Sequence, residues 1–241
     1  MALILNLETA TTVCSVALAK DGNLVSFKEI DGDYSHAENL TAFINDVFNQ
    51  SEYELNEVDA IAVSMGPGSY TGLRIGVSVA KGICYSLDKP LIAINTLSHI
   101  SYSVSAGLRN NKPNLRDSNI LFCPMLDARR MEVYCALFDI ENNCIMPTAA
   151  IIIDELSFEK QLEKNLIYFF GNGAPKCKQF LSNNPNAIFI NDIRASAKHM
   201  IPLTQDAYNK SSFADVAYFE PFYLKDFVAG KKKKENNLSK E

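Results

Sequence analysis

Residues 58–87 read VDAIAVSMGPGSYTGLRIGVSVAKGICYSL, and they are the most informative segment of the sequence. The apolar run at 58–64 predicts a buried strand, a glycine-rich turn follows at 66–72, and a helix is expected from there to about Leu87. A turn between a strand and a helix N-terminus can hold an anion with its backbone N–H groups. However, no Gly-Lys-Ser/Thr follows, and Gly72 falls one residue late for a dinucleotide-binding fingerprint. A phosphate-binding turn and a purely structural tight turn both stay open, and we favour the structural turn.

The segments around this stretch complete a recognisable order of elements in the first 95 residues. Short strands at 2–7, 13–19 and 24–30 predict an antiparallel meander. A helix is expected at 36–50, behind a capping box formed by Ser35 and Glu38, and a further strand at 91–94. The order strand-strand-strand-helix-strand-helix-strand resembles that of one lobe of an actin-like ATPase.

From Thr96 the pattern restarts less clearly. Helices are expected near 96–107, 155–163, 174–182 and 194–208, and strands near 119–124, 131–139, 148–153, 166–170 and 187–190. We therefore predict an α/β fold of two lobes with mixed sheets flanked by helices. The expected divisions are an N-terminal lobe at 1–95, a C-terminal lobe at 96–227 and a basic, disordered tail at 228–241.

Composition excludes several classes of protein. The 241 residues are 47% hydrophobic and 21% charged, which is typical of a folded globular chain. The apolar runs are too short to cross a bilayer and the first residues lack a basic signal region, so we expect no membrane association. The six cysteines form no Cys-x-x-Cys pair, which indicates reduced core residues in a cytoplasmic protein.

The net charge of −5 is unevenly distributed. Residues 231–241 carry five lysines and two glutamates, or +3, which leaves −8 on residues 1–230. The body should therefore not bind nucleic acid strongly by itself. The run Lys231, Lys232, Lys233, Lys234 either helps to hold nucleic acid or simply keeps the tail soluble, and we favour the second interpretation.

The helix after the glycine-rich turn is apolar nearly all round, which predicts that both of its sides are covered. One stripe, expected to face the sheet, consists of Ile75, Val79, Ile83 and Leu87. A second stripe is made of small residues, with larger apolar ones beside it: Gly72, Gly76, Ala80, Leu73 and Val77. Glycine in a helix costs about 0.5–1 kcal/mol relative to alanine, so the small stripe indicates a close approach. We expect a helix of another chain there, with a contact inside the chain as the alternative.

Several polar residues near turns are candidate site residues. Arg74 lies in the first helical turn, where the helix dipole disfavours a cation, so it predicts an acidic or phosphate partner or else stacking on Tyr70. Asp127 with Arg129 could orient a ligand or close a turn, and we favour the turn. The Gly171–Gly173 turn could admit a nucleotide or could be a plain strand-to-helix turn. His36 is a lone histidine, for which a surface or capping role is expected.

The string at 66–76, GPGSYTGLRIG, followed by Ala80, Lys81 and Gly82, resembles the signature of the TsaB family, formerly YeaZ. The strings DARR at 127–130, EVY at 132–134, GNGA at 171–174 and LNLETA at 5–10 also fall where that family has them. The resemblance spans residues 1 to about 225. It implies an actin-like (ASKHA) fold and a role in making N6-threonylcarbamoyladenosine (t6A) at position 37 of tRNAs that read ANN codons.

The resemblance further implies a non-catalytic subunit that pairs with a metal-bearing paralogue, TsaD, through N-lobe helices, while the small ATPase TsaE docks on the pair. ATP and metal are then expected on the partner proteins, with none held by this chain, and tRNA is reached through the complex. For the chain alone, a homodimer stays open. The alternative is a stand-alone ATP-dependent kinase or transferase that holds nucleotide at the turn of residues 171–174.

The implied site residues fall into three groups. The expected partner interface comprises Gly72, Leu73, Arg74, Gly76, Val77, Ala80, Lys81, His36 and Leu40. The family-motif loop comprises Gly66, Pro67, Gly68, Ser69, Tyr70 and Thr71. Residues that bind a ligand or only form turns are Asp127, Arg129, Glu132, Gly171 and Gly173. No catalytic or metal-binding residue is expected.

Overall fold

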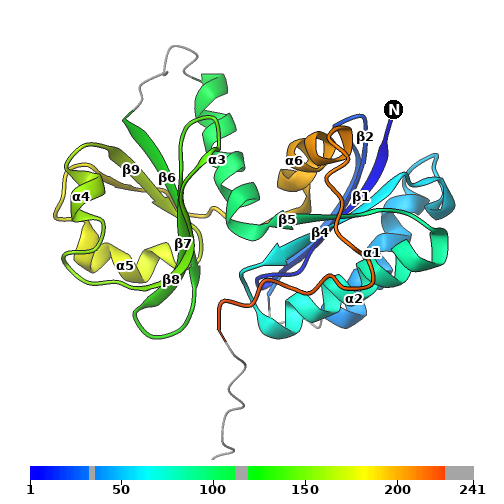
Figure 1. The fold of residues 1–241 in the computed structure, drawn as a ribbon, viewed down its shortest axis with the longest axis horizontal. Coiled ribbons are helices and arrows are strands. Elements are labelled where there is room, and N and C mark those ends of the chain that lie inside the picture. The colour runs from blue at the N-terminus through cyan, green and yellow to red at the C-terminus, as the bar shows by residue number, and fades with distance from the viewer. Residues whose placement is uncertain (33–35, 112–118, 226–241) are drawn as a thin grey trace, which may run out of the picture.

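Two five-stranded sheets, each with helices packed against it, make up the computed structural model of the chain, which describes residues 1–32, 36–111 and 119–225 (Figure 1). The first sheet contains β1 (Leu3–Glu8), β2 (Val13–Lys20), β3 (Asn23–Asp31), β4 (Ala60–Gly66) and β5 (Leu91–Asn95). The first three strands form an antiparallel meander, and β4 and β5 add to it in parallel, in the spatial order β3-β2-β1-β4-β5.

The second sheet repeats this topology. Its strands are β6 (Ile120–Asp127), β7 (Glu132–Phe138), β8 (Cys144–Ile152), β9 (Leu166–Phe170) and β10 (Ala187–Phe189). Again three strands form an antiparallel meander and two add in parallel, so the order β8-β7-β6-β9-β10 matches that of the first sheet. The repeated order confirms the predicted fold of two actin-like lobes.

Helices cover both faces of the first sheet. On one face lie α1 (His36–Asn49) and α2 (Tyr70–Leu87), and on the other lies α6 (Ala197–Asn209). Because the central strand β1 is covered on both sides, all six of its residues are buried. In the second sheet, α3 (Thr96–Asn111) covers one face and α5 (Ala174–Leu181) packs with the short α4 (Glu159–Leu162) on the other. A 3₁₀ turn at Leu55–Glu57 completes the elements.

The second lobe is shorter than the range 96–227 expected from the sequence, because the chain returns to the first sheet. The α6 residues Met200 and Ile201 are buried there, against Ile4 and Ala17 respectively. After α6, Ala214 forms a β-bridge with Leu91 of β5. Residues 213–225 then run along the first lobe as a segment that we call the strap (Figure 1).

Two smaller expectations also change. The helix expected at 155–163 is reduced to the four residues of α4, and the strand expected at 148–153 begins earlier, at Cys144. Five of the six cysteines are buried and all six are free, in agreement with their interpretation as reduced core residues, and only Cys144 is exposed. Among the described helices none is long and apolar enough to span a membrane. Ser35 of the expected capping box and the tail at 228–241 lie outside the described residues.

Candidate functional site

The glycine-rich turn before α2 packs directly on the turn between β1 and β2. A Cβ at Gly68 would stand 2.2 Å from the carbonyl oxygen of Ala10, and the Ser69 N–H donates to that same oxygen over 2.7 Å. Ser69 also caps α2, because its hydroxyl accepts a hydrogen bond from the Gly72 N–H. These N–H groups are used within the chain, so the contacts favour the structural interpretation of the turn over anion binding.

The rest of the motif loop joins β4 to α2. Gly66 has φ +111° and is linked to Pro67 by a cis peptide bond. Next to it, the N–H of Phe222 in the strap donates to the Met65 carbonyl oxygen over 2.7 Å. Tyr70 and Thr71 are the first residues of α2. The loop therefore meets two other segments of the chain, the β1–β2 turn and the strap.

The small-residue stripe of α2 faces the interior of its own lobe, which corrects the expected contact with another chain. Gly72, Gly76 and Ala80 are buried. A Cβ at Gly72 would stand 2.0 Å from the Thr9 carbonyl oxygen, and one at Gly76 would stand 2.3 Å from Thr9 Oγ1. The Thr9 hydroxyl donates to the Gly72 carbonyl oxygen over 2.8 Å. The glycines do permit a close approach, but the end of β1 makes it.

Three more residues expected at the partner interface are also inaccessible. Leu73 and Val77 beside the small stripe, and Leu40 on α1, are buried in the core of the first lobe. A bulky substitution at Gly76 would therefore disturb folding rather than test docking.

The opposite side of α2 borders an open groove beside α1. Ile75 and Val79, expected to face the sheet, are only half-buried here. The groove has a volume of about 470 Å³ and is lined by Ala37, Tyr70, Thr71, Arg74, Ile75, Ser78 and Val79. The helix is thus turned so that its glycines face the sheet and its branched residues face outward, because only glycine fits against Thr9.

The polar residues expected at the interface have partners within the chain. Arg74 donates to the Tyr70 hydroxyl over 3.2 Å and lies 5.5 Å from the centre of that ring, so the stacking alternative describes it. His36 Nε2 lies 2.8 Å from the Thr11 carbonyl oxygen. Lys81 donates to the carbonyl oxygens of residues 217 and 219 in the strap. Of these three, the exposed Arg74 is the one that lines the groove.

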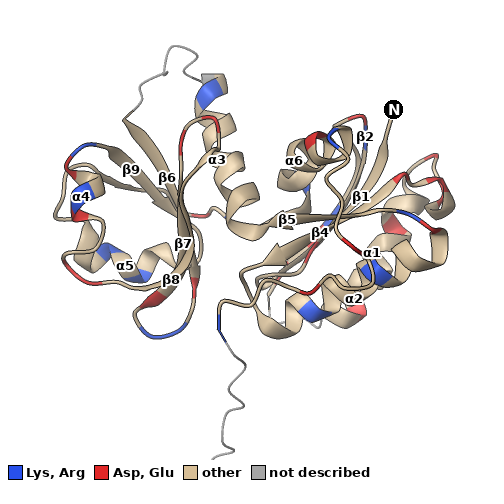
Figure 2. Cartoon of the chain, viewed as in Figure 1, with Lys and Arg blue, Asp and Glu red and all other residues tan. Residues whose placement is uncertain are grey.

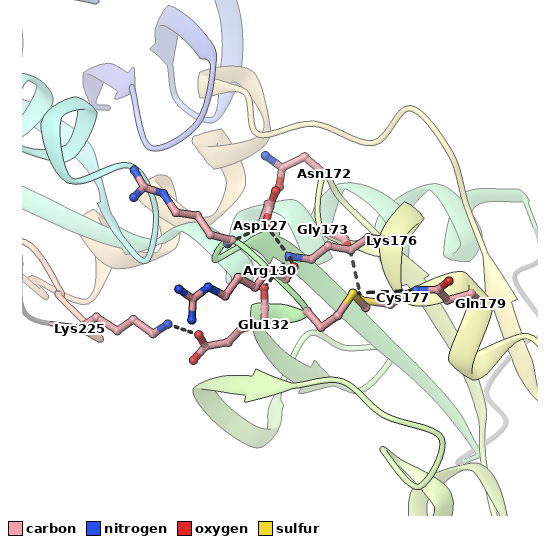
Figure 3. A network of polar contacts seen from close by, with 11 residues as sticks. Asp127, Arg130, Glu132, Asn172, Gly173, Lys176, Cys177, Gln179 and Lys225 are labelled. Atoms are coloured by element: carbon pink, nitrogen blue, oxygen red, sulfur yellow. Dashed lines mark hydrogen bonds and ion pairs between the residues drawn. The ribbon is translucent and has the colours of Figure 1, made fainter. Parts of the chain in front are cut away.

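A second polar cluster lies where the two lobes meet, at the turn between β6 and β7 (Figure 3). Lys176 of α5 reaches this turn and donates to Asp127 Oδ1 over 2.5 Å and to the carbonyl oxygens of Arg130 and Glu132 over 2.7 Å each. The Glu132 side chain pairs with Lys225 of the strap. Asp127 and Glu132 are therefore both neutralised by lysines.

Arg129 and Arg130 stand side by side at the tip of that turn with left-handed backbone conformations, at φ 70° and 49°. Asp127 supports them, because its Oδ1 accepts the Arg129 N–H over 2.8 Å. Both arginine side chains are exposed. The turn expected around Asp127 and Arg129 is thus confirmed, and it displays two guanidinium groups.

The turn between β9 and α5 packs against the end of β6. Gly171 has φ +95°, and a Cβ there would stand 2.4 Å from the Met125 carbonyl oxygen, while one at Gly173 would stand 2.8 Å from the Leu126 carbonyl carbon. Asn172 Oδ1 accepts the Asp127 N–H over 3.0 Å. The two glycines therefore serve the plain strand-to-helix turn that the sequence left as one of two alternatives.

A smaller cavity of about 220 Å³ lies between the lobes. It is lined by Gly171 and Asn172 from the second lobe and by Thr11, Thr12 and Asp31 from the first, among others. Asp31 forms an ion pair with Arg194, which also lines the cavity. This ion pair lies between the end of β3 and the segment that leads into α6.

Sequence reasoning missed a buried ionisable pair at the end of β1. Glu8 Oε2 lies 2.6 Å from His99 Nε2 of α3, and both side chains are fully buried. Glu8 Oε1 also accepts the Ala10 N–H over 2.5 Å. His199 of α6 is near, and burial, followed by repulsion from His99 and Lys198, lowers its pKa to about 4. Glu8 could have indicated such a pair, because it is an acidic residue at the end of a mostly apolar strand. Its partner His99 could not be identified, because it is distant in sequence.

Comparison with known proteins places this geometry in a family. The family model described as TsaD, tRNA N6-adenosine threonylcarbamoyltransferase, matches residues 33–232. The chain is 28% identical over 237 residues to the tRNA threonylcarbamoyladenosine biosynthesis protein TsaB of Escherichia coli K12, covering 95% of this chain and 97% of that protein. The chain is also 32% identical over 117 residues to the tRNA N6-adenosine threonylcarbamoyltransferase of Staphylococcus haemolyticus, but this match covers only 42% of this chain and 34% of that protein.

Solved structures agree on the fold. A Pseudomonas aeruginosa protein described as similar to the peptidase YeaZ superposes with a TM-score of 0.76 at 22% identity, covering 93% of this chain and all of that one. The TsaB and YeaZ proteins thus match along nearly the whole length of the chain, while the Staphylococcus haemolyticus transferase matches only in part.

Proposed function

Because the chain belongs to the TsaD family and is similar to TsaB along nearly its whole length, we propose that it is the non-catalytic subunit that pairs with TsaD for threonylcarbamoyl transfer to tRNA. A role in t6A biosynthesis follows from the family and the TsaB relatives. The proposal adds the scaffold role, the partner and the surface that binds it. TsaE docks on the pair, and ATP and metal are held by the partner proteins.

The observation that carries the proposal is the groove between α1 and α2. Ile75 and Val79 are half-buried apolar residues on an open surface, and Ala37 faces them from α1. Two helices side by side with an apolar groove between them can pack against two equivalent helices of a related fold. We assign this groove to TsaD, and to a second copy of the chain when TsaD is absent.

The acidic residues at two strand ends make contacts within the chain. The two acidic residues that end β1 and β6 both have basic partners, since Glu8 contacts His99 and Asp127 contacts Lys176. Both carboxylates hold segments of the chain together, and the proposal leaves the transfer step to TsaD. The free cysteines fit a reducing compartment, so the proposal places the complex in the cytoplasm.

The test is Ser78→Arg, which places a long charged side chain in the groove without removing buried apolar surface. Ser78 is exposed and lines the groove, so the variant should fold normally but lose co-elution with TsaD from the same organism. Threonylcarbamoyl transfer to tRNA, measured with TsaD, TsaE and the acyl-adenylate supplied, should fall with it. The matched control is Ser182→Arg at the end of α5, an exposed serine of the other lobe.

Two results would contradict the proposal. If Ser78→Arg still co-elutes with TsaD as the wild type does, the groove is not the docking surface. If transfer proceeds equally well when the chain is omitted, the subunit role itself is wrong. Binding of ATP to the chain alone, measured by calorimetry, would instead favour a stand-alone ATP-dependent kinase or transferase.

A further inference from the structure

The turn between β6 and β7 carries positive charge that the chain does not neutralise. Its two acidic residues are already paired, Asp127 with Lys176 and Glu132 with Lys225. Within the described residues neither Arg129 nor Arg130 makes a side-chain hydrogen bond, ion pair or ring contact. The cluster of four basic and two acidic side chains thus keeps a local charge of +2.

That local charge contrasts with the rest of the chain. Residues 1–230 carry a net charge of −8, and Figure 2 shows acidic and basic residues interspersed along both lobes. A body of this charge repels a polyanion in general, so a polyanion would be contacted at a small positive spot rather than along a broad basic face. The two arginines form such a spot.

The backbone of the turn indicates that the arginines themselves matter. A left-handed conformation costs a non-glycine residue about 1–2 kcal/mol, and the turn adopts it at Arg129 and again at Arg130. Asp127 and Lys176 hold the strained turn in place through the backbone of both residues. Glycine would adopt this turn without strain, so strain at two successive arginines points to a role for their side chains.

Guanidinium groups suit phosphate oxygens in particular, because their planar donors can bind two oxygens at once. The turn is also connected to the proposed docking groove. Lys225 links Glu132 to the strap, and two residues earlier Tyr223 lies 5.0 Å, ring centre to ring centre, from Tyr70 at the start of α2. In Figure 3 Arg130 extends from the turn toward the side on which Lys225 of the strap lies. The Tyr70 end of the groove and this turn are therefore linked through the strap.

From these observations we infer that Arg129 and Arg130 contact backbone phosphates of the tRNA while the chain is docked on TsaD. The inference rests on the proposed function and deepens it, because it gives the non-catalytic subunit a direct part in holding the substrate. The arginines add to a binding site that is mostly supplied by the partner.

The test compares Arg129→Ala/Arg130→Ala with the wild type, as the full chain in complex with TsaD. Alanine, like arginine, carries a Cβ, so the left-handed conformation of the turn costs it the same strain. The probe is an unmodified tRNA transcript, and its affinity is measured by fluorescence anisotropy over a series of salt concentrations. Two lost phosphate contacts should reduce the magnitude of the slope of log K against log salt by about 1 to 2 and weaken binding at every salt concentration.

The control is Lys160→Ala/Lys164→Ala, which removes two exposed cations at and beside α4, in the second lobe. It should leave the slope unchanged. Arg129→Lys/Arg130→Lys should restore most of the slope, because the charge returns, but only part of the affinity, because the two-oxygen geometry does not.

Other outcomes would overturn the inference. An unchanged slope in the alanine variant would exclude a phosphate contact. Loss of co-elution with TsaD would assign the arginines to the protein interface, and loss of ATP binding by the chain without loss of tRNA affinity would assign them to a nucleotide. Failure of wild-type co-elution would refute the proposed function instead, so the two failures are distinguishable.

Discussion

Replacing Gly76 of α2 by alanine should destabilise the chain, although alanine is normally the better helix former by about 1 kcal/mol. The new Cβ would stand 2.3 Å from Thr9 Oγ1 and 3.5 Å from Val63 Cγ2. Thr9 is fully buried, and its hydroxyl donates to the Gly72 carbonyl oxygen over 2.8 Å. The hydroxyl therefore cannot move away without losing that bond.

The magnitude follows from these contacts. Overpacking a filled core costs about 1–3 kcal/mol, and losing a hydrogen bond costs about 0.5–1.5 kcal/mol. The gain in helix propensity offsets about 1 kcal/mol of these costs, so we expect Gly76→Ala to lower the free energy of unfolding by about 2 kcal/mol. Urea denaturation followed by far-UV circular dichroism measures the difference, with the slope m expected to stay unchanged.

The same helix supplies the matched control. Gly82 is exposed and has no atom within 4 Å of an added Cβ, so Gly82→Ala should stabilise the chain by about 1 kcal/mol. The double variant Thr9→Ala/Gly76→Ala should recover most of the loss, because the atom at 2.3 Å is gone. If Gly76→Ala is as stable as the wild type or more so, α2 does not pack on Thr9 and the assignment of its outward groove fails with it.

Two further predictions concern the half-buried His199 and the glycine turn at Gly171. Burial lowers the pKa of His199 from 6.5 to about 4. As the pH falls, the unfolded chain therefore binds a proton at this histidine before the folded chain does. The stability that the neutral ring contributes is fully present above pH 6.5 and is lost as the pH falls toward 4. Between pH 7 and pH 5 the wild type should therefore lose up to about 2 kcal/mol more stability than His199→Gln, and equal losses in urea denaturation would refute the assignment. Gly171→Ala should lower the free energy of unfolding by about 2 kcal/mol or more, because φ is +95° and the added Cβ would stand 2.4 Å from the Met125 carbonyl oxygen. The control Gly107→Ala in α3, whose added Cβ meets no atom within 4 Å, should be stabilising. Equal melting temperatures for these two variants would contradict this prediction.

The order of elements was predictable from the sequence because it depends on local patterns. Alternating and helical periodicity indicated the meander, the helices of the first lobe and most strands of the second. The helix expected at 155–163 is an exception, since most of that segment forms turns and α4 keeps only four helical residues. The motif at 66–76 indicated a resemblance to TsaB, which the similarity to TsaB along nearly the whole chain confirmed.

The orientation of α2 was not predictable in the same way. The helix is apolar nearly all round, so periodicity cannot rank its faces. The glycines indicated a close approach, but only the fold shows that Thr9 at the end of β1 makes it. The expected interface residues Gly72, Gly76 and Ala80 were therefore wrong as a surface, while Ile75 and Val79 were wrong as core.

The sequence by itself determined which segments become strands and helices, because neighbouring residues decide hydrophobic periodicity and capping. Tertiary structure alone decided the contacts between distant segments: Glu8 with His99, Glu132 with Lys225, and α6 on the first sheet. Such pairings depend on how the sheets bring residues that are remote in sequence together, and no local sequence pattern specifies which of these residues meet. The groove likewise exists only because α1 and α2 pack side by side, and the arginine turn is linked to the strap by the contact of Glu132 with Lys225.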